Sequence, residues 1–177
     1  LWEDSWDPLW DAVESTGLPL SFHAFNISAT SSESDHIASA ACSLVLAPER
    51  ADEVLSILIL SGVLERHPEM KVVLGESGIG WLPYILERLD YSYQNRLTDL
   101  GLPVLPSEYF KRQVYATFIQ DHWGTKAMWE LGYLDNIMWS TDYPHRDSTW
   151  PDSINNADKT FESLPPEVRR SCIHDNV

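Results

Sequence analysis

Histidines and carboxylates follow the short apolar runs of this sequence. Four such runs occur, and each is followed by side chains that can bind a metal ion or move a proton. These side chains are His23 after the first run, Glu76 after the second, Gln120, Asp121 and His122 after the third, and Asp142 and His145 after the fourth. A neutral imidazole and a carboxylate from different strands are suitable ligands for Zn²⁺ or Mn²⁺. They do not complete a site, because zinc enzymes usually hold the ion with three protein ligands and leave one position open.

Each of these residues also has an ordinary structural interpretation. A lone histidine such as His23, next to Phe22, is more often a satisfied core or rim residue than a ligand. Asp142 alone is typical of a turn or a helix cap, and Glu76 and His145 could be solvated loop residues. The combination favours a site, because parallel strands bring their carboxyl ends to one rim, where α/β folds bind ligands.

Strands and helices alternate along the chain, which predicts a parallel sheet with right-handed crossovers. The expected strands are 18–25, 71–78, 113–118 and 136–142, and the expected helices are 6–16, 36–46, 48–66, 81–93, 121–132 and 165–177, with a loop at 26–35. The run at 71–78 is typical of a strand buried on both faces. We expect residues 20–23, 72–76, 114–118 and 137–142 to be neighbouring strands in that order.

Length and composition predict a single α/β domain over residues 1–177. The formal charge of −15 argues against nucleic acid and anionic membranes as partners, because both require a cationic surface. The sequence has no long apolar run for a membrane span and no secretory signal pattern. Cys42 and Cys172 lie far apart in no metal or redox spacing, so we expect two reduced, buried thiols in a cytoplasmic protein.

Several stretches resemble, in order, the second half of the amidohydrolase-related family. They are "LPLSFHA", "ERHPEMKVVLGESGIGWLPYILERLD", "QVYATF", "WSTDYPH" and the tail "RRSCIHDNV". This family contains aminocarboxymuconate-semialdehyde decarboxylase, aromatic-acid decarboxylases, lactonases and hydratases. The resemblance implies the C-terminal half of a (β/α)₈ TIM barrel, strands five to eight, with one divalent metal ion. Zn²⁺ is the first expectation and Mn²⁺ the second. The family's fifth-strand ligand falls on His23 and its eighth-strand ligand on Asp142.

The sequence departs from the family pattern at two points. Decarboxylases of the family have a histidine where Glu76 stands in "GESG", which leaves its role open between general base, substrate hydrogen-bond partner and no catalytic role. The first-strand pair of metal ligands, His-x-His or Glu-x-His, does not occur in these 177 residues. Four expected strands are also half of what a barrel needs. The resemblance therefore implies activity only together with an N-terminal half.

The expected function is that of a metal-dependent hydrolase or decarboxylase, acting on a small carboxylated aromatic or ring-opened substrate through a metal-bound water. Asp142 and Glu76 are the expected catalytic residues, His23 and Asp142 the metal ligands, and His145 and Trp81 the substrate-binding residues. We expect a homo-oligomer or association with an N-terminal half, since exposed sheet edges need a partner. The alternative is a non-catalytic half-barrel that serves as a binding or regulatory subunit. Substrate, metal and the type of bond cleaved stay open.

Overall fold

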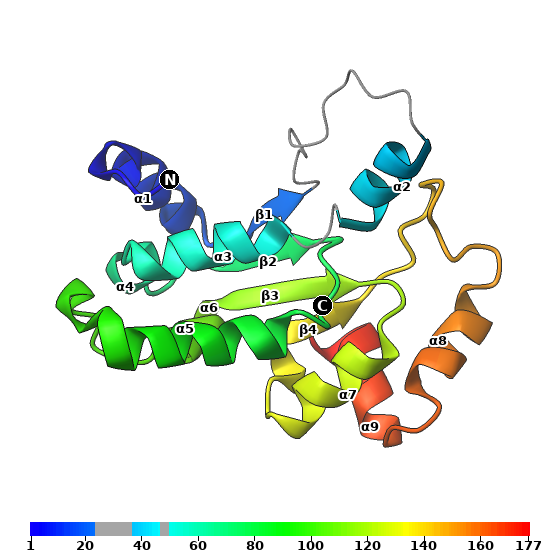
Figure 1. Ribbon diagram of the computed structural model, residues 1–177. Coiled ribbons are helices and arrows are strands. Elements are labelled where there is room, and N and C mark those ends of the chain that lie inside the picture. Colours follow the sequence, from blue (N-terminus) through cyan, green and yellow to red (C-terminus); the bar gives the residue numbers. More distant parts are fainter. Residues whose placement is uncertain (24–36, 47–49) are drawn as a thin grey trace.

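A four-stranded parallel sheet forms the centre of the molecule. The computed structural model describes residues 1–23, 37–46 and 50–177 (Figure 1). The strands are β1 (Leu20–His23), β2 (Val72–Gly75), β3 (Val114–Phe118) and β4 (Ile137–Trp139). They are hydrogen-bonded in the order β1-β2-β3-β4, and every pair is parallel. The predicted order and direction of the four strands are therefore confirmed.

The described helices precede, connect and follow the strands. They are α1 (Asp7–Thr16), α2 (Ile37–Leu46), α3 (Ala51–Leu60), α4 (Val63–Arg66), α5 (Leu82–Arg96), α6 (Pro106–Gln113), α7 (His122–Glu130), α8 (Ser153–Phe161) and α9 (Pro166–Arg170). Short 3-10 turns occupy Asp4–Trp6, Thr98–Leu100 and Leu134–Asn136, and a π-helical segment occupies Ser171–Asp175. Figure 1 shows α3 and α5 in front of the sheet, with the strands running behind them.

One face of the sheet carries the core. Side chains alternate between the faces of a strand, and Val72, Leu74, Val114 and Ala116 are fully buried on the helix side. They form one cluster with buried residues of the helices, such as Leu58 of α3. On the opposite face the side chains of β2 and β3 are only half-buried. The expectation that 71–78 is buried on both faces was wrong for this chain, because the described helices pack on one face.

Local backbone conformation explains where elements end differently from expectation. The predicted helix 48–66 is divided into α3 and α4 at Gly62, which has a left-handed φ of 73°. The predicted strand 136–142 ends at Trp139, before the left-handed Asp142. Helices α6 and α8 were missed. Of the two thiols expected to be buried, Cys172 is buried, but Cys42 is exposed. The predicted loop 26–35 and the start of the helix at 48 lie outside the described residues.

The helices are short compared with the thickness of a bilayer. Within the part of the chain that the structure describes, no helix is long and apolar enough to cross a membrane.

Candidate metal centre

The end of β1 brings His23 next to the end of β2. His23 is the last residue of β1 and pairs in register with Gly75. Its Nε2 lies 2.8 Å from Oε1 of Glu76, the first residue after β2. A Cβ on Gly75 would lie 3.3 Å from the Phe22 carbonyl oxygen, a tight distance, and 3.6 Å from Cδ2 of His23, an ordinary contact distance. The two strand ends therefore join an imidazole to a carboxylate.

The loop after β4 makes a second pair of the same kind. Nδ1 of His145 lies 2.6 Å from Oδ2 of Asp142, and the backbone N–H of His145 donates to the Asp142 carbonyl. The Asp142 side chain is 10% exposed and the His145 side chain 60%. The hydrogen bond with Asp142 and the negative charge of that carboxylate raise the pKa of His145 above its ordinary value. The buried member of this pair is therefore the carboxylate.

The two pairs meet at the rim of the sheet. Ligand atoms of Glu76, Asp142 and His145 all lie within 4.8 Å of one another, and Glu76 also contacts His23. Glu76, Asp142 and His145 provide two carboxylates and one imidazole, a donor set of the type that holds Zn²⁺ or Mn²⁺, whereas His23 is not part of this convergent group and reaches it only through its contact with Glu76. Metal ligands must be deprotonated, so an ion would replace any proton that an imidazole shares with its carboxylate. The donor chemistry of this cluster therefore fits a divalent metal ion.

Both carboxylates of the cluster sit on unusual backbone. Glu76 has a φ of 51° and Asp142 a φ of 55°, and among the described residues no other non-glycine residue has a positive φ. The Glu76 N–H donates to Oγ1 of Thr117 on β3 at 2.7 Å, and the Asp142 N–H donates to Oγ of Ser140 at 3.2 Å. Such conformations cost about 1–3 kcal/mol each and are concentrated at functional sites. This observation singles out the two carboxylates independently of their spacing in the sequence.

The residues that follow β3 hold neighbouring loops and helices in place and are not members of the cluster. Nδ1 of His122 lies 2.8 Å from the Thr160 carbonyl of α8, and Gln120 donates to Asn156 of the same helix. The carboxylate of Asp121 accepts hydrogen bonds from backbone N–H groups. The structure thus gives the third strand end a supporting role at the rim.

Trp81 lies beside the cluster's loop but is directed partly into the protein. Its indole N–H donates to the Ser77 carbonyl at 2.8 Å, and the half-buried ring packs against the core. Its expected role in substrate binding stays a prediction, as does that of His145. Sequence analysis did not single out Tyr143, whose exposed ring lies 5.4 Å from that of Trp150 next to Asp142 and His145. Tyr143 lies between Asp142 and His145 in the sequence, and this placement is the signal that could have identified it as a neighbour of the cluster.

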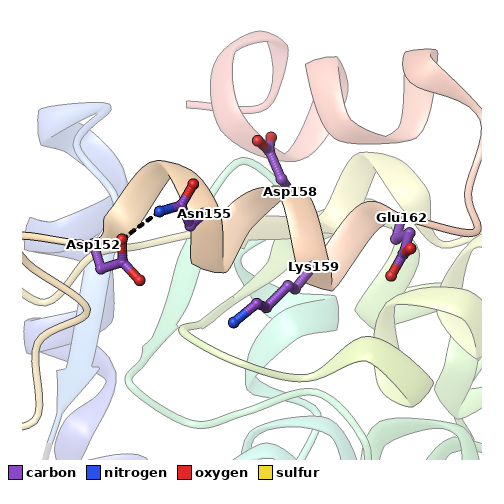
Figure 2. A pocket seen from close by; sticks show the side chains of 5 residues that line it. All are labelled: Asp152, Asn155, Asp158, Lys159 and Glu162. Atoms are coloured by element: carbon purple, nitrogen blue, oxygen red, sulfur yellow. Dashed lines mark hydrogen bonds between the residues drawn. The ribbon is translucent and has the colours of Figure 1, made fainter.

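A shallow groove elsewhere on the surface has a different character. It runs along α8 and is lined by Asp152, Asn155, Asp158, Lys159 and Glu162. Figure 2 shows these side chains spread along the helix and pointing in different directions, with one hydrogen bond between Asp152 and Asn155. None of the cluster residues lines this groove. The convergent side chains at the ends of the strands remain the stronger candidate for chemistry.

Comparison with known proteins identifies the family. The amidohydrolase family model matches residues 1–176, so the chain belongs to the amidohydrolase family. The structure of 5-carboxyvanillate decarboxylase from Sphingomonas paucimobilis is similar, with 26% identity and a TM-score of 0.79, over 99% of this chain and 52% of that one. No curated protein sequence matches the chain.

Two further structures support the fold. 2,6-Dihydroxybenzoate decarboxylase from Rhizobium has 22% identity and a TM-score of 0.71, over 99% of this chain and 54% of that one. Dihydroxybenzoic acid decarboxylase from Polaromonas, with bound manganese and the inhibitor 2-nitroresorcinol, has 20% identity and a TM-score of 0.72, over 99% and 53%. The chain thus spans about half the length of these structures. The expected α/β fold, half of an amidohydrolase barrel, is confirmed.

Proposed function

We propose that this chain carries part of the active site of a metal-dependent decarboxylase or hydrolase. The proposed substrate is a small carboxylated aromatic acid or its ring-opened product. The observation that carries the proposal is the convergence of Glu76 and Asp142, both on left-handed backbone, with two imidazoles at one rim. Membership of the amidohydrolase family supports it, and so does similarity to decarboxylases whose names specify aromatic acids.

In this proposal His23 and Asp142 hold the metal ion. His23 ends β1 and Asp142 follows β4, the two outer strands of the sheet, and Glu76 lies between them: it contacts His23 and its ligand atoms lie within 4.8 Å of those of Asp142 and His145. When bound, a divalent ion polarises substrate oxygens and makes water a better acid. The first four strands of a complete barrel would provide the remaining ligands. Zn²⁺ and Mn²⁺ both suit nitrogen and carboxylate donors.

Glu76 and Asp142 would transfer the protons. Decarboxylation replaces the lost carbon dioxide by one proton on the carbon that carried it, whereas hydrolysis takes one proton from the attacking water and delivers it to the leaving group as the C–N or C–O bond breaks. A carboxyl group can do either when it lies at the reacting atoms. Glu76 is suited to exchange a proton at Oε1, the atom that contacts His23 Nε2, and Asp142 at Oδ2, the atom that contacts His145 Nδ1. The exposed His145 and the ring of Trp81 would contact the substrate.

Metal analysis and turnover of the complete enzyme test this proposal. Hydroxylated aromatic acids would be assayed for release of carbon dioxide, and lactones and amides for hydrolysis, with Mn²⁺ or Zn²⁺ added. We expect His23→Ala to weaken metal binding and Glu76→Gln to lower kcat by about 10²-fold or more, the usual contribution of a proton-transferring group.

His174→Ala is the matched control for His23→Ala. His174 is an exposed imidazole whose Nδ1 lies 2.8 Å from Asp175, the same type of contact as His23 with Glu76. This variant should keep both metal content and turnover. Metal binding that survives His23→Ala would contradict the ligand assignment. A metal-loaded protein without turnover on any compound tested would favour the binding-subunit alternative.

A further inference from the structure

Asp121 joins two loops at the rim through its carboxylate. Oδ2 accepts hydrogen bonds from the backbone N–H groups of Ile79 at 2.9 Å and Gly80 at 2.6 Å. Oδ1 accepts one from the N–H of Gly124 at 2.9 Å, in the first turn of α7. Both oxygens therefore face backbone donors, two in the turn that follows Glu76 and one in the helix that follows β3.

The fit around this carboxylate depends on two glycines. A Cβ on Gly80 would lie 3.2 Å from both carboxylate oxygens of Asp121. A Cβ on Gly124 would lie 2.5 Å from Oδ1 and 2.7 Å from the Gly80 backbone nitrogen. Gly124 is buried, and one of the two close atoms is a backbone nitrogen, so a Cβ at position 124 could be accommodated only if the Asp121 carboxylate and the Gly80 backbone moved. Any side chain at position 124 would therefore separate the two loops.

The turn that Asp121 holds begins at Glu76. Ser77, which is fully buried, bonds through Oγ to the carbonyls of Leu74 and Gly78. The Glu76 N–H is held from the neighbouring strand by Thr117. A left-handed conformation at a glutamate persists only when its surroundings fix it from more than one side. Thr117 fixes the beginning of the segment and Asp121 fixes its end.

We propose that Asp121 is a positioning residue that keeps the Glu76 carboxylate at the metal centre, by holding the turn at residues 78–80 against the start of α7. This inference rests on the proposed function of Glu76. Asp121 is not one of the cluster residues, and its carboxylate acts through the backbone N–H groups that it holds. Asparagine at 121 presents an amide NH₂ where a carboxylate oxygen now accepts, so at least one N–H donor faces another donor and the turn moves.

The test compares three single variants of the complete enzyme. Asp121→Asn removes the charge while keeping the shape, and Gly124→Ala displaces the carboxylate without changing any charge. Asp90→Asn is the matched control, because the Asp90 carboxylate also links two helices, accepting from the N–H and Oγ of Ser107 at 2.8 and 2.7 Å. Each protein is measured for kcat and KM, for Mn²⁺ affinity, and for amide hydrogen exchange in the 76–81 segment.

A positioning role gives a specific pattern. Asp121→Asn and Gly124→Ala should each lower kcat by roughly 10- to 100-fold with KM changed less than about twofold, because small displacements of a reacting group have large effects. Mn²⁺ should bind about 10-fold more weakly, because Glu76 contacts the proposed ligand His23 and would no longer orient it. Exchange at Ile79 and Gly80 should accelerate. Asp90→Asn should change none of these.

Other results overturn the inference. Unchanged exchange at Ile79 and Gly80 in Asp121→Asn would show that the carboxylate does not hold the turn. Faster exchange with unchanged kcat and Mn²⁺ affinity would show that the turn does not position Glu76. If the unmodified enzyme has no turnover, the proposed function fails separately, and exchange and Mn²⁺ affinity still decide whether Asp121 positions the cluster.

Discussion

Glu76 and Asp142 each have a carboxylate that can bind a metal ion or transfer a proton, and each has a left-handed backbone that is unfavourable for a residue with a Cβ. For an L-residue, the left-handed conformation brings Cβ close to the following carbonyl oxygen and costs roughly 1–2 kcal/mol. The carboxylates reach the rim despite this cost because Thr117 and Ser140 bond to their N–H groups. The left-handed backbone of these two residues is unfavourable for stability. This indicates that the conformation is kept because it places the two carboxylates at the rim.

Removing the Glu76 side chain in two ways separates strain from side-chain effects. Glu76→Ala and Glu76→Gly both lose the contact with His23, but only glycine adopts a φ of 51° without steric conflict. We expect Glu76→Gly to be more stable than Glu76→Ala by about 1 kcal/mol in denaturant unfolding. Both variants should lose turnover in the complete enzyme.

Glu87, an exposed residue within α5, provides the reference for this comparison. In a helix interior glycine is less stable than alanine by about 1 kcal/mol, so Glu87→Gly should be less stable than Glu87→Ala. Opposite signs at the two positions would establish the strain at Glu76. The same sign at both positions would contradict it.

Sequence reasoning located the cluster residues but not their partners. His23, Glu76, Asp142 and His145 could be selected because each follows an apolar run, and parallel strands end at one rim. The contact of Glu76 with His23 depends on strand register and side-chain direction. Their metal-binding and catalytic roles stay predictions. Left-handed backbone at non-glycine residues leaves no signal in a single sequence.

At the scale of elements, the two ends of the sheet are stabilised by different chemistry. At the carboxyl ends of the strands, Asp121 accepts hydrogen bonds from backbone N–H groups. At the amino ends, buried amides donate to backbone carbonyls. Gln113, immediately before β3, donates to His67 and Met70, and Asn136, immediately before β4, donates to three carbonyls. In barrel folds this opposite end serves stability rather than catalysis.

Asn136→Ala tests this division between the two ends. The Asn136 side chain is buried, and its Nδ2 donates to the carbonyls of Phe110, Lys111 and Val114 at 2.9–3.2 Å. Its loss leaves buried carbonyls without this donor, so we expect a decrease of about 1–3 kcal/mol in the free energy of unfolding. Mn²⁺ affinity of the folded complete enzyme should not change, because the cluster lies at the other end of the strands.

Asn95→Ala is the control for Asn136→Ala. Asn95 is exposed on α5, and its amide donates to the Tyr91 carbonyl at 2.7 Å. An exposed substitution of this kind should change stability by less than about 0.5 kcal/mol. A loss at Asn95 equal to the loss at Asn136 would mean that burial of the amide does not matter. Weaker Mn²⁺ binding in Asn136→Ala would mean that the two ends of the sheet are not independent.

Elements with a regular apolar pattern were predictable, and those without one were not. The four strands and α5 follow from apolar runs and a four-residue spacing, both confirmed. Helix α8 contains Asn155, Asn156 and Asp158, residue types with low helix propensity, so its sequence resembles a loop. It is stabilised instead by packing, since Ala157 and Phe161 are buried. Tertiary contacts of this kind are absent from local sequence.

At the scale of the whole molecule, the sheet is open at both sides. β1 and β4 are its outer strands, and each pairs on one side only with a strand of the described chain. The face that carries His23 and Ser21 is exposed at β1 and half-buried at β2 and β3. Several large apolar side chains are also exposed, including Trp2, Leu18 and Ile154. Unpaired edges and exposed apolar surface favour association.

The 177-residue chain on its own should therefore self-associate and bind metal weakly. Association would cover the outer edges of β1 and β4, whereas the net charge of −15 opposes it. Salt screens that repulsion, since the Debye length falls from about 10 Å at 0.1 M to about 3 Å at 1 M. Light scattering should therefore show larger species as salt is raised.

Metal binding by the chain on its own should be weak, because identical copies cannot provide first-strand ligands. Titration with Mn²⁺ or Zn²⁺ should show this weak binding, and the chain should be inactive until joined to an N-terminal half. A salt-independent monomer that holds one tightly bound ion would contradict both the need for a partner and the incomplete ligand set.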